Sequence, residues 1–118
     1  MIFVTLTYPP SANRLWRNVK GKTLKSAEYR AWVTANSYLE KRPQEPIPGP
    51  YELTLRAYAP DKRRRDLGNL EKATSDFLQT VGFVTDDCNA RKITLEWGEG
   101  APARIEVRIT PIMPKVAR

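Results

Sequence analysis

The chain contains no histidine and only one cysteine, Cys88, among its 118 residues. Without histidine there is no Ser–His or Cys–His catalytic couple, no HExxH zinc site and no histidine general base. A single cysteine excludes disulfides within the chain and zinc modules built from several cysteines. We assign no functional role to Cys88. Any chemistry must therefore come from carboxylates, lysine, arginine, tyrosine or a hard metal ion bound through oxygen.

Long apolar runs are also absent. No stretch approaches the ~20 residues that a membrane span needs, and the N-terminus has neither a basic n-region nor a small-residue cleavage site. We therefore expect a cytoplasmic protein with no membrane partner. With 41% hydrophobic and 28% charged residues, the composition predicts one globular domain over residues 1–118, in which residues 111–118 form a flexible tail.

Charge of one sign is in excess. The chain has 20 Lys and Arg against 13 Asp and Glu, a net charge of +7, which favours a polyanionic partner, nucleic acid ahead of an anionic membrane. Mild basicity without such a partner is also common. Residues 1–42 hold eight of the cations against two acids, Glu28 and Glu40, so most of the net charge lies in this segment.

The apolar pattern predicts four strands and two helices. Alternation with period two marks the strands, whose inward positions are Ile2, Val4, Leu6 and Tyr8; Tyr51, Leu53, Leu55 and Ala57; Ile93, Leu95 and Trp97; and Ile105, Val107 and Ile109. The first helix is expected from the N-cap Ser26 to about Lys41, with an apolar stripe of Ala31, Trp32, Ala35, Tyr38 and Leu39. The second is expected from the N-cap Asp66 to Val81, with Gly82 after its last turn and a buried face of Leu67, Leu70, Thr74, Phe77, Leu78 and Val81.

This order, β-α-β-α-β-β, predicts an α+β fold in which two helices pack on one face of a small mixed sheet. The residues between the last two strands, 98–102, are interpreted as a hairpin loop because they contain two glycines and a proline. A linker with four prolines, residues 43–50, is expected to cross the surface.

Four consecutive cations, Lys62, Arg63, Arg64 and Arg65, lead into the second helix. Because free amides and the dipole at a helix start favour anions, arginine donors beside them can form a phosphate site. A solvated basic loop is the ordinary alternative for such a run. The run ends at Asp66, at a helix start. A basic loop that only keeps the protein soluble does not need this position.

Two adjacent acids, Asp86 and Asp87, follow the Gly82 cap. Held close to Asp66 they would repel one another and favour a cation such as Mg²⁺ between them, although a plain Asp-Asp turn is an equally simple interpretation. Lys72 lies on the same helix face as Gly68 and Asp76, where it can face this site or form an i,i+4 pair with Asp76.

The segment between the first strand and the first helix is interpreted as a loop that binds the nucleic-acid backbone, because cations and an aromatic residue are interleaved there. As an alternative to a contact with nucleic acid, Trp16 can be buried in the hydrophobic core. The cations of this loop are Arg14, Arg17, Lys20, Lys22 and Lys25.

Several blocks together resemble the RusA family of Holliday-junction resolvases. They are Pro9-Pro-Ser-x-Asn13-Arg14-x-x-Arg17, Ser26-x-x-Tyr29, Pro60-Asp-Lys-Arg-Arg-Arg-Asp66-Leu-x-Asn69-Leu-x-Lys72 and Gly82-Phe-x-x-Asp86-Asp87. The resemblance implies a homodimeric, Mg²⁺-dependent endonuclease, with Mn²⁺ as a substitute, that acts in DNA recombination and repair. It would bind four-way junctions, nick two strands symmetrically, be carried by phages or prophages and use no nucleotide cofactor.

By position, the resemblance assigns catalysis to Asp66, Lys72 and Asp87. Asp66 and Asp87 would hold the metal with Asp86 as a further oxygen donor, while Asn69 and the cations above would contact DNA. The family has another aspartate two residues after the first, where this chain has Gly68. The leading hypothesis is therefore a junction endonuclease, and its main alternative is a junction-binding protein of the same fold that Gly68 leaves inert.

A general RNA-binding module is the third hypothesis. No strand of this chain carries the aromatic-rich pattern with which such sheets stack on RNA bases, and this disfavours it.

Overall fold

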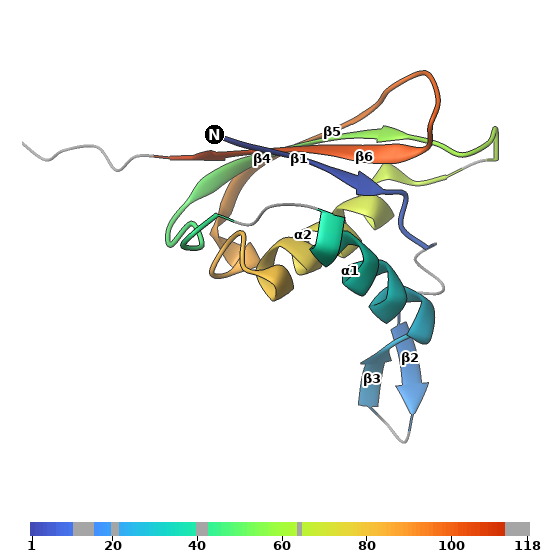
Figure 1. Cartoon of the computed structure of the whole chain (residues 1–118), viewed down its shortest axis with the longest axis horizontal. Helices are drawn as coiled ribbons and strands as arrows, with labels where there is room; N and C mark the ends of the chain where they lie inside the picture. Colours follow the sequence, from blue (N-terminus) through green and yellow to red (C-terminus); the bar gives the residue numbers. More distant parts are fainter. Residues whose placement is uncertain (11–15, 20–21, 40–42, 64, 113–118) are drawn as a thin grey trace, which may run out of the picture.

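The computed structural model describes residues 1–10, 16–19, 22–39, 43–63 and 65–112. The elements are β1 (Ile2–Thr7), β2 (Trp16–Val19), β3 (Lys22–Lys25), α1 (Ala27–Leu39), β4 (Tyr51–Tyr58), α2 (Leu67–Val81), the 3₁₀ turn η2 (Asp87–Asn89), β5 (Ala90–Trp97) and β6 (Arg104–Pro111). Figure 1 shows a four-stranded sheet with both helices on one side of it. The predicted α+β fold is confirmed.

The sheet has the order β1-β6-β4-β5. β6 runs antiparallel to both β1 and β4, and β4 pairs in parallel with β5, so the sheet is mixed. The expected hairpin across residues 98–102 is therefore wrong, because β4 lies between β5 and β6. A loop of this length can step over one strand, since the two neighbours of a strand lie only about 10 Å apart.

A separate two-stranded ribbon occupies the segment that we expected to be a loop. β2 and β3 pair antiparallel, and Val19 faces Lys22 across the last described pair. In Figure 1 this β2–β3 hairpin projects beyond α1 on the side away from the large sheet. Arg17, Lys22 and Lys25 are thus placed on a projecting ribbon, and the expected irregular loop is corrected.

α2 follows the expected pattern closely. Asp66 is its N-cap, with a side-chain oxygen that accepts from the Gly68 amide at 2.9 Å. Gly82 ends it in the left-handed conformation, at φ 96°, which glycine adopts without steric cost. The expected face is buried apart from Leu67, which is half-buried, and Ala73 and Ser75 are buried as well.

α1 begins as expected, since the Ser26 hydroxyl oxygen accepts from the Tyr29 amide at 3.1 Å. Its expected apolar stripe is wrong in part. Ala31 and Ala35 are exposed, whereas Tyr29, Trp32 and Asn36 are buried. The side chains of Tyr38 and Leu39, and the expected last residues of the helix, 40 and 41, lie outside the described part of the chain.

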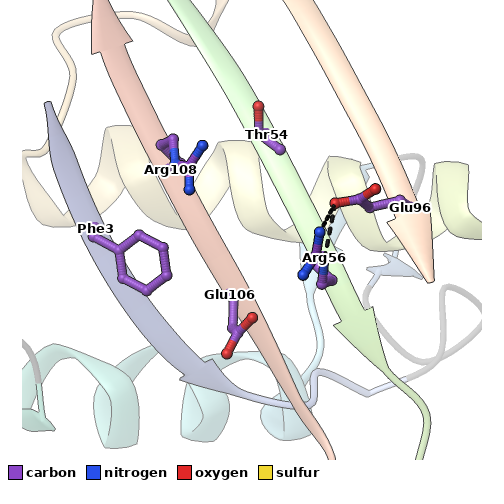
Figure 2. Close-up of a pocket in the computed structure, with 6 residues that line it drawn as sticks. All are labelled: Phe3, Thr54, Arg56, Glu96, Glu106 and Arg108. Carbon is purple, nitrogen blue, oxygen red and sulfur yellow. Dashed lines mark hydrogen bonds and ion pairs between the residues drawn. The ribbon is translucent and has the colours of Figure 1, made fainter. Parts of the chain in front are cut away.

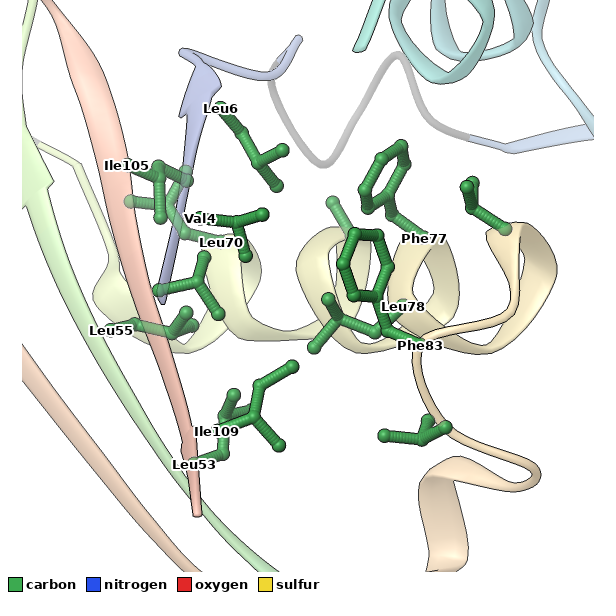
Figure 3. Close-up of a cluster of buried hydrophobic side chains, with 14 of the residues drawn as sticks. Val4, Leu6, Leu53, Leu55, Leu70, Phe77, Leu78, Phe83, Ile105 and Ile109 are labelled. Carbon is green, nitrogen blue, oxygen red and sulfur yellow. The ribbon is translucent and has the colours of Figure 1, made fainter. Parts of the chain in front are cut away.

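The core lies between the sheet and the helices. Figure 3 shows Val4, Leu6, Leu53, Leu55, Ile105 and Ile109 from the strands meeting Leu70, Phe77 and Leu78 from α2 and Phe83 beyond it. Trp32 of α1 meets Phe77 edge-on, with ring centres 5.3 Å apart. This packing fixes α2, and with it the residues at both of its ends, against the sheet.

Candidate active site and nucleic-acid interface

The first half of the site is the start of α2. Asp66, Gly68, Asn69 and Lys72 are all exposed there. A Cβ atom placed on Gly68 would lie 3.3 Å from Oδ1 of Asp66. A side chain at position 68 would therefore stand directly beside the Asp66 carboxylate.

The second half is η2, which links α2 to β5. Asp86 caps this turn, and its Oδ1 accepts from the Cys88 amide at 2.9 Å. This hydrogen bond lowers the pKa of Asp86. Asp86 is thus held ionised, with one of its oxygens already engaged by the backbone.

Asp87 has an unusually anionic environment. Partial desolvation raises its pKa, and the negative charges of Asp86, Asp76 and Glu71 raise it further. A cation bound beside this carboxylate would relieve the repulsion, which is the condition that a hard divalent ion satisfies. Glu71 was missed by sequence reasoning, because it occupies an unspecified position of the quoted motif and only the fold brings it near Asp87.

Two side chains hold the backbone of Asp87. Its amide donates to Oε1 of Gln79 on α2 at 2.8 Å, and the Tyr51 hydroxyl of β4 lies 3.5 Å from its carbonyl oxygen. Burial and then the charges of Asp87, Glu71 and Asp86 raise the pKa of Tyr51 to about 12. Tyr51 therefore stays neutral at physiological pH and can donate to the Asp87 carbonyl.

The two halves are not assembled into one metal site. The charges that raise the pKa of Asp87 come from Asp86, Asp76 and Glu71, and Asp66 is not among them. Within the described ranges, no three Asp, Glu or Cys side chains gather closely enough to hold a metal ion. The structure thus groups Asp87 with Asp86, Asp76 and Glu71, and Glu71 is about one and a half turns along α2 from Asp66.

Asp76 is engaged by α1. The Tyr29 hydroxyl donates to Oδ2 of Asp76 and also lies 3.2 Å from the carbonyl oxygen of Ala73. Burial and this acidic partner raise the pKa of Tyr29 well above its usual value. Asp76 therefore ties the two helices together. Tyr29 belongs to one of the motif blocks, and this contact gives that residue a structural role between the two helices.

The basic run before α2 is only partly free. Arg65 donates to Oδ1 of Asp61 at 2.6 Å, and its guanidinium lies 5.7 Å from the centre of the Tyr8 ring. The hydrogen bonds from Arg65 and from the Arg63 amide lower the pKa of Asp61 to about 2. Lys62 and Arg63 are exposed. Asp61 thus shapes the loop and holds Arg65 against it.

Part of the expected interface lies outside the described residues, namely Arg14, Lys20 and Arg64. For Arg17, Lys22 and Lys25 the backbone of the β2–β3 hairpin is described. None of the helices in the described ranges is long and apolar enough to cross a membrane.

Comparison with known proteins places the chain among nucleases. The family model for endodeoxyribonuclease RusA matches residues 7–110. The crossover junction endodeoxyribonuclease RusA of Escherichia coli (strain K12) is 36% identical over 116 residues, covering 91% of this chain and 92% of that protein. The corresponding proteins of Shigella sonnei (strain Ss046) and Enterobacteria phage 82 are also 36% identical, with the same coverage.

Proposed function

Because the chain belongs to the RusA family of endodeoxyribonucleases, we propose that it resolves four-way DNA junctions by paired, symmetric nicks. The observation that carries this proposal is the match of the family model over residues 7–110, which spans both the start of α2 and η2. Two symmetric nicks require two sites related by a two-fold axis, so we propose that the protein acts as a homodimer.

The nucleic-acid contacts in this proposal come from two basic segments. The β2–β3 hairpin carries Arg17, Lys22 and Lys25; in the sequence Arg14 precedes it and Lys20 falls between its two strands. The loop before α2 carries Lys62, Arg63, Arg64 and Arg65. Asn69, exposed in the first turn of α2, adds a neutral donor. Contacts of this kind position the phosphate backbone without reading bases, so recognition would follow the shape of the junction.

The chemistry is assigned to carboxylates and one lysine. The family suggests a divalent metal cofactor, and Mg²⁺, or Mn²⁺ in its place, suits a set of carboxylate oxygens. We assign the metal to Asp66 and Asp87, with Asp86 as a further donor; when bound, such an ion activates water and offsets charge on the phosphate. Lys72, on the exposed face of α2, would stabilise the charge that develops on the reacting phosphate.

Gln79 and Tyr51 are positioning residues in this proposal. They hold the amide and the carbonyl of Asp87 from opposite elements, α2 and β4. The backbone that carries the Asp87 carboxylate is therefore restrained. This restraint reduces the entropy that the residue loses when it binds a cation or a phosphate.

A second candidate function is junction binding without efficient cutting. The specific observation is Gly68, which leaves the start of α2 with one carboxylate where the resemblance gives two. A metal held by fewer anions binds more weakly, whereas the removal of a negative charge favours DNA. This alternative keeps the fold, the dimer and the interface, and differs only in turnover.

The test is a nicking assay on a synthetic four-way junction, with Mg²⁺, with Mn²⁺ and with a chelator. Resolution into paired nicked duplexes that needs the metal supports the endonuclease. Tight junction binding without nicks in either metal supports the binding protein. Equal affinity for junction, duplex and single strand at matched salt contradicts both candidate functions, because each of them requires preferential binding to the four-way junction.

A further inference from the structure

An acid, Asp61, directly precedes the most basic run of the chain, Lys62, Arg63, Arg64 and Arg65. A carboxylate at this place repels the phosphates that the proposed function brings to the run, so electrostatics alone give no reason for it. The contacts of Asp61 supply a reason, because this side chain is hydrogen-bonded to the run itself.

Asp61 organises a tight turn and engages one arginine of it. The Arg63 amide donates to Oδ1 of Asp61 at 2.8 Å, which closes a turn of the Asx type. Nη1 of Arg65 donates to the same carboxylate oxygen at 2.6 Å and lies 3.3 Å from the carbonyl oxygens of both Asp61 and Arg63. One nitrogen of the Arg65 guanidinium therefore meets three acceptors on a single turn.

The Tyr8 ring restrains the Arg65 guanidinium from a second direction. The central carbon of this guanidinium lies 5.7 Å from the centre of the ring, within the range of a cation–π contact. The Arg65 side chain is 22% exposed, whereas that of Arg63, whose Nε lies 3.8 Å from Oδ2 of Asp61, is 84% exposed. Two arginines of the same run thus differ, since one is held in place and the other extends into solvent.

One edge of the Arg65 guanidinium is left for a ligand. Within the part of the chain that the structure describes, Nη1 makes all the hydrogen bonds of this side chain, and Nε and Nη2 make none. Nε and Nη2 share one edge of the planar group and can donate two parallel hydrogen bonds to the two non-bridging oxygens of a phosphate diester. Because the other side of the group is already fixed, little freedom is lost when a phosphate binds.

Stability does not explain the pair of Asp61 and Arg65. The Asp61 side chain is 44% exposed, and exposed ion pairs contribute little to folding. The chain has a comparable pair, Arg56 with Glu96, at 2.8 Å, in which the glutamate is 43% exposed. Figure 2 shows this second pair on the side of the sheet away from the helices. It lies outside the basic run and therefore provides a matched control.

We propose that Asp61 is a positioning residue for DNA binding, which fixes the Arg65 guanidinium beside the Tyr8 ring so that Nε and Nη2 bind one backbone phosphate. This deepens the proposed function and rests on it, since it identifies the arginine of the basic run that grips a phosphate with two donors and the acid that directs it. The ligand is a phosphate diester, so the contact serves duplex arms and junction alike.

The affinity for a four-way junction and for a plain duplex, measured in chelator, tests this role. Asp61→Ala removes a negative charge, so electrostatics alone predict a dissociation constant up to about threefold lower, for unit charges ~6 Å apart in water. The positioning role predicts the opposite sign. A lost charged hydrogen bond and the ordering of a released arginine each correspond to roughly tenfold. We therefore expect the dissociation constant to rise at least about fivefold on both DNAs.

Further measurements separate positioning from a loss of structure. The slope of log affinity against log salt should fall by about 0.9 in Asp61→Ala, the value of one lost phosphate contact, although the net charge of the protein rises. In an Arg65→Ala background, Asp61→Ala should no longer weaken binding, because the group that it positions is gone. Glu96→Ala removes an equally exposed acid from an arginine and should leave the affinity within twofold. Arg65→Lys keeps the charge without the planar donor pair, so it should weaken binding and lower the slope similarly, and it replaces Asp61→Ala if that variant does not fold.

Each result decides the proposal. Weaker binding in Asp61→Ala that disappears in the Arg65→Ala background supports it, as does weaker binding in Arg65→Lys. Unchanged or tighter binding in Asp61→Ala, the same loss in both backgrounds, an equal loss in Glu96→Ala, or parental affinity in Arg65→Lys overturns it. The outcome is separate from that of the proposed function, because a protein that binds duplex and junction equally refutes junction resolution, while the effect of Asp61→Ala on duplex affinity still decides this proposal.

Discussion

Introducing a carboxylate at position 68 tests the chemistry of the proposed site without changing the fold around it. Gly68 is exposed at the start of α2, and a Cβ atom there would lie 3.3 Å from Oδ1 of Asp66. The Asp66 side chain is exposed as well, so it can move by the few tenths of an ångström that the substitution needs. The substitution keeps the backbone amide at position 68, which donates to the N-cap Asp66, so the cap should remain.

The stability of Gly68→Asp should change by no more than about 1 kcal/mol. Asp exceeds Gly in helix propensity by a few tenths of a kcal/mol, and an anion in the first turn adds ~0.3–1 kcal/mol. Repulsion between carboxylates about 4 Å apart in water costs up to about 1 kcal/mol. Because these contributions oppose each other, a melting curve of the variant should overlay that of the parent closely.

The effect on metal binding should be much larger. One more unit charge about 4 Å from a divalent ion in water contributes about 2 kcal/mol, which lowers the metal dissociation constant ~30-fold. We expect metal-dependent nicking of a four-way junction to rise by orders of magnitude in Gly68→Asp. Asp66→Asn added to this variant should abolish the gain.

The matched control is Gly68→Asn, which has the same shape without the charge and should gain nothing. The assay is a Mg²⁺ titration of nicking, with junction affinity measured in parallel in chelator. Parent protein that already cuts at full rate, with no change in Gly68→Asp, would refute the reasoning. Asp86 would then be the better candidate for the missing ligand.

Three further predictions follow from the same geometry. Alanine at all three arginines 63–65 should reduce the slope of log affinity against log salt by up to about 2.7, at ~0.9 per lost phosphate contact, and an unchanged slope would show that the run is only a solvated loop. Gln79→Ala removes the acceptor of the Asp87 amide, so nicking should fall at least tenfold while junction affinity stays within twofold; equal losses of both would argue against a positioning role. Tyr51 has a pKa of about 12 in the folded state against 10.0 for an unperturbed tyrosine, so the unfolded chain loses this proton first and stability should fall as pH rises from 10 to 12. Chemical denaturation across this range should show a smaller loss in Tyr51→Phe, and equal slopes in both proteins would contradict the assignment.

Local signals made α2 predictable from the sequence. Asp66 and Gly82 act through their immediate neighbours, one as an acceptor for a free amide and the other through its left-handed backbone. The helical spacing of the buried residues between them can be recognised without knowing which element packs against α2. Asp66, Asn69 and Lys72 therefore lie at the start of the helix, as the sequence predicted.

Features set by tertiary contacts were not predictable. Asn36 is fully buried in α1, because its side chain accepts from the Thr7 amide at 2.9 Å and donates to the Thr7 hydroxyl at 2.9 Å and the Trp32 carbonyl at 2.8 Å. An apolar count cannot recognise a polar side chain that the fold satisfies, so Ala31 and Ala35 were preferred in error. The approach of Glu71 to Asp87 depends likewise on how η2 returns along α2.

The position of β6 has a consequence for how the chain is made. β6, the last strand in the described residues, lies between β1 and β4. During synthesis, Val4 and Leu6 therefore have no neighbouring strand until β6 has left the ribosome. Pairing over such a sequence separation is intrinsically slow. A prematurely terminated product that ends before β6 cannot join β1 to β4, so the apolar residues of β1 would stay exposed in it.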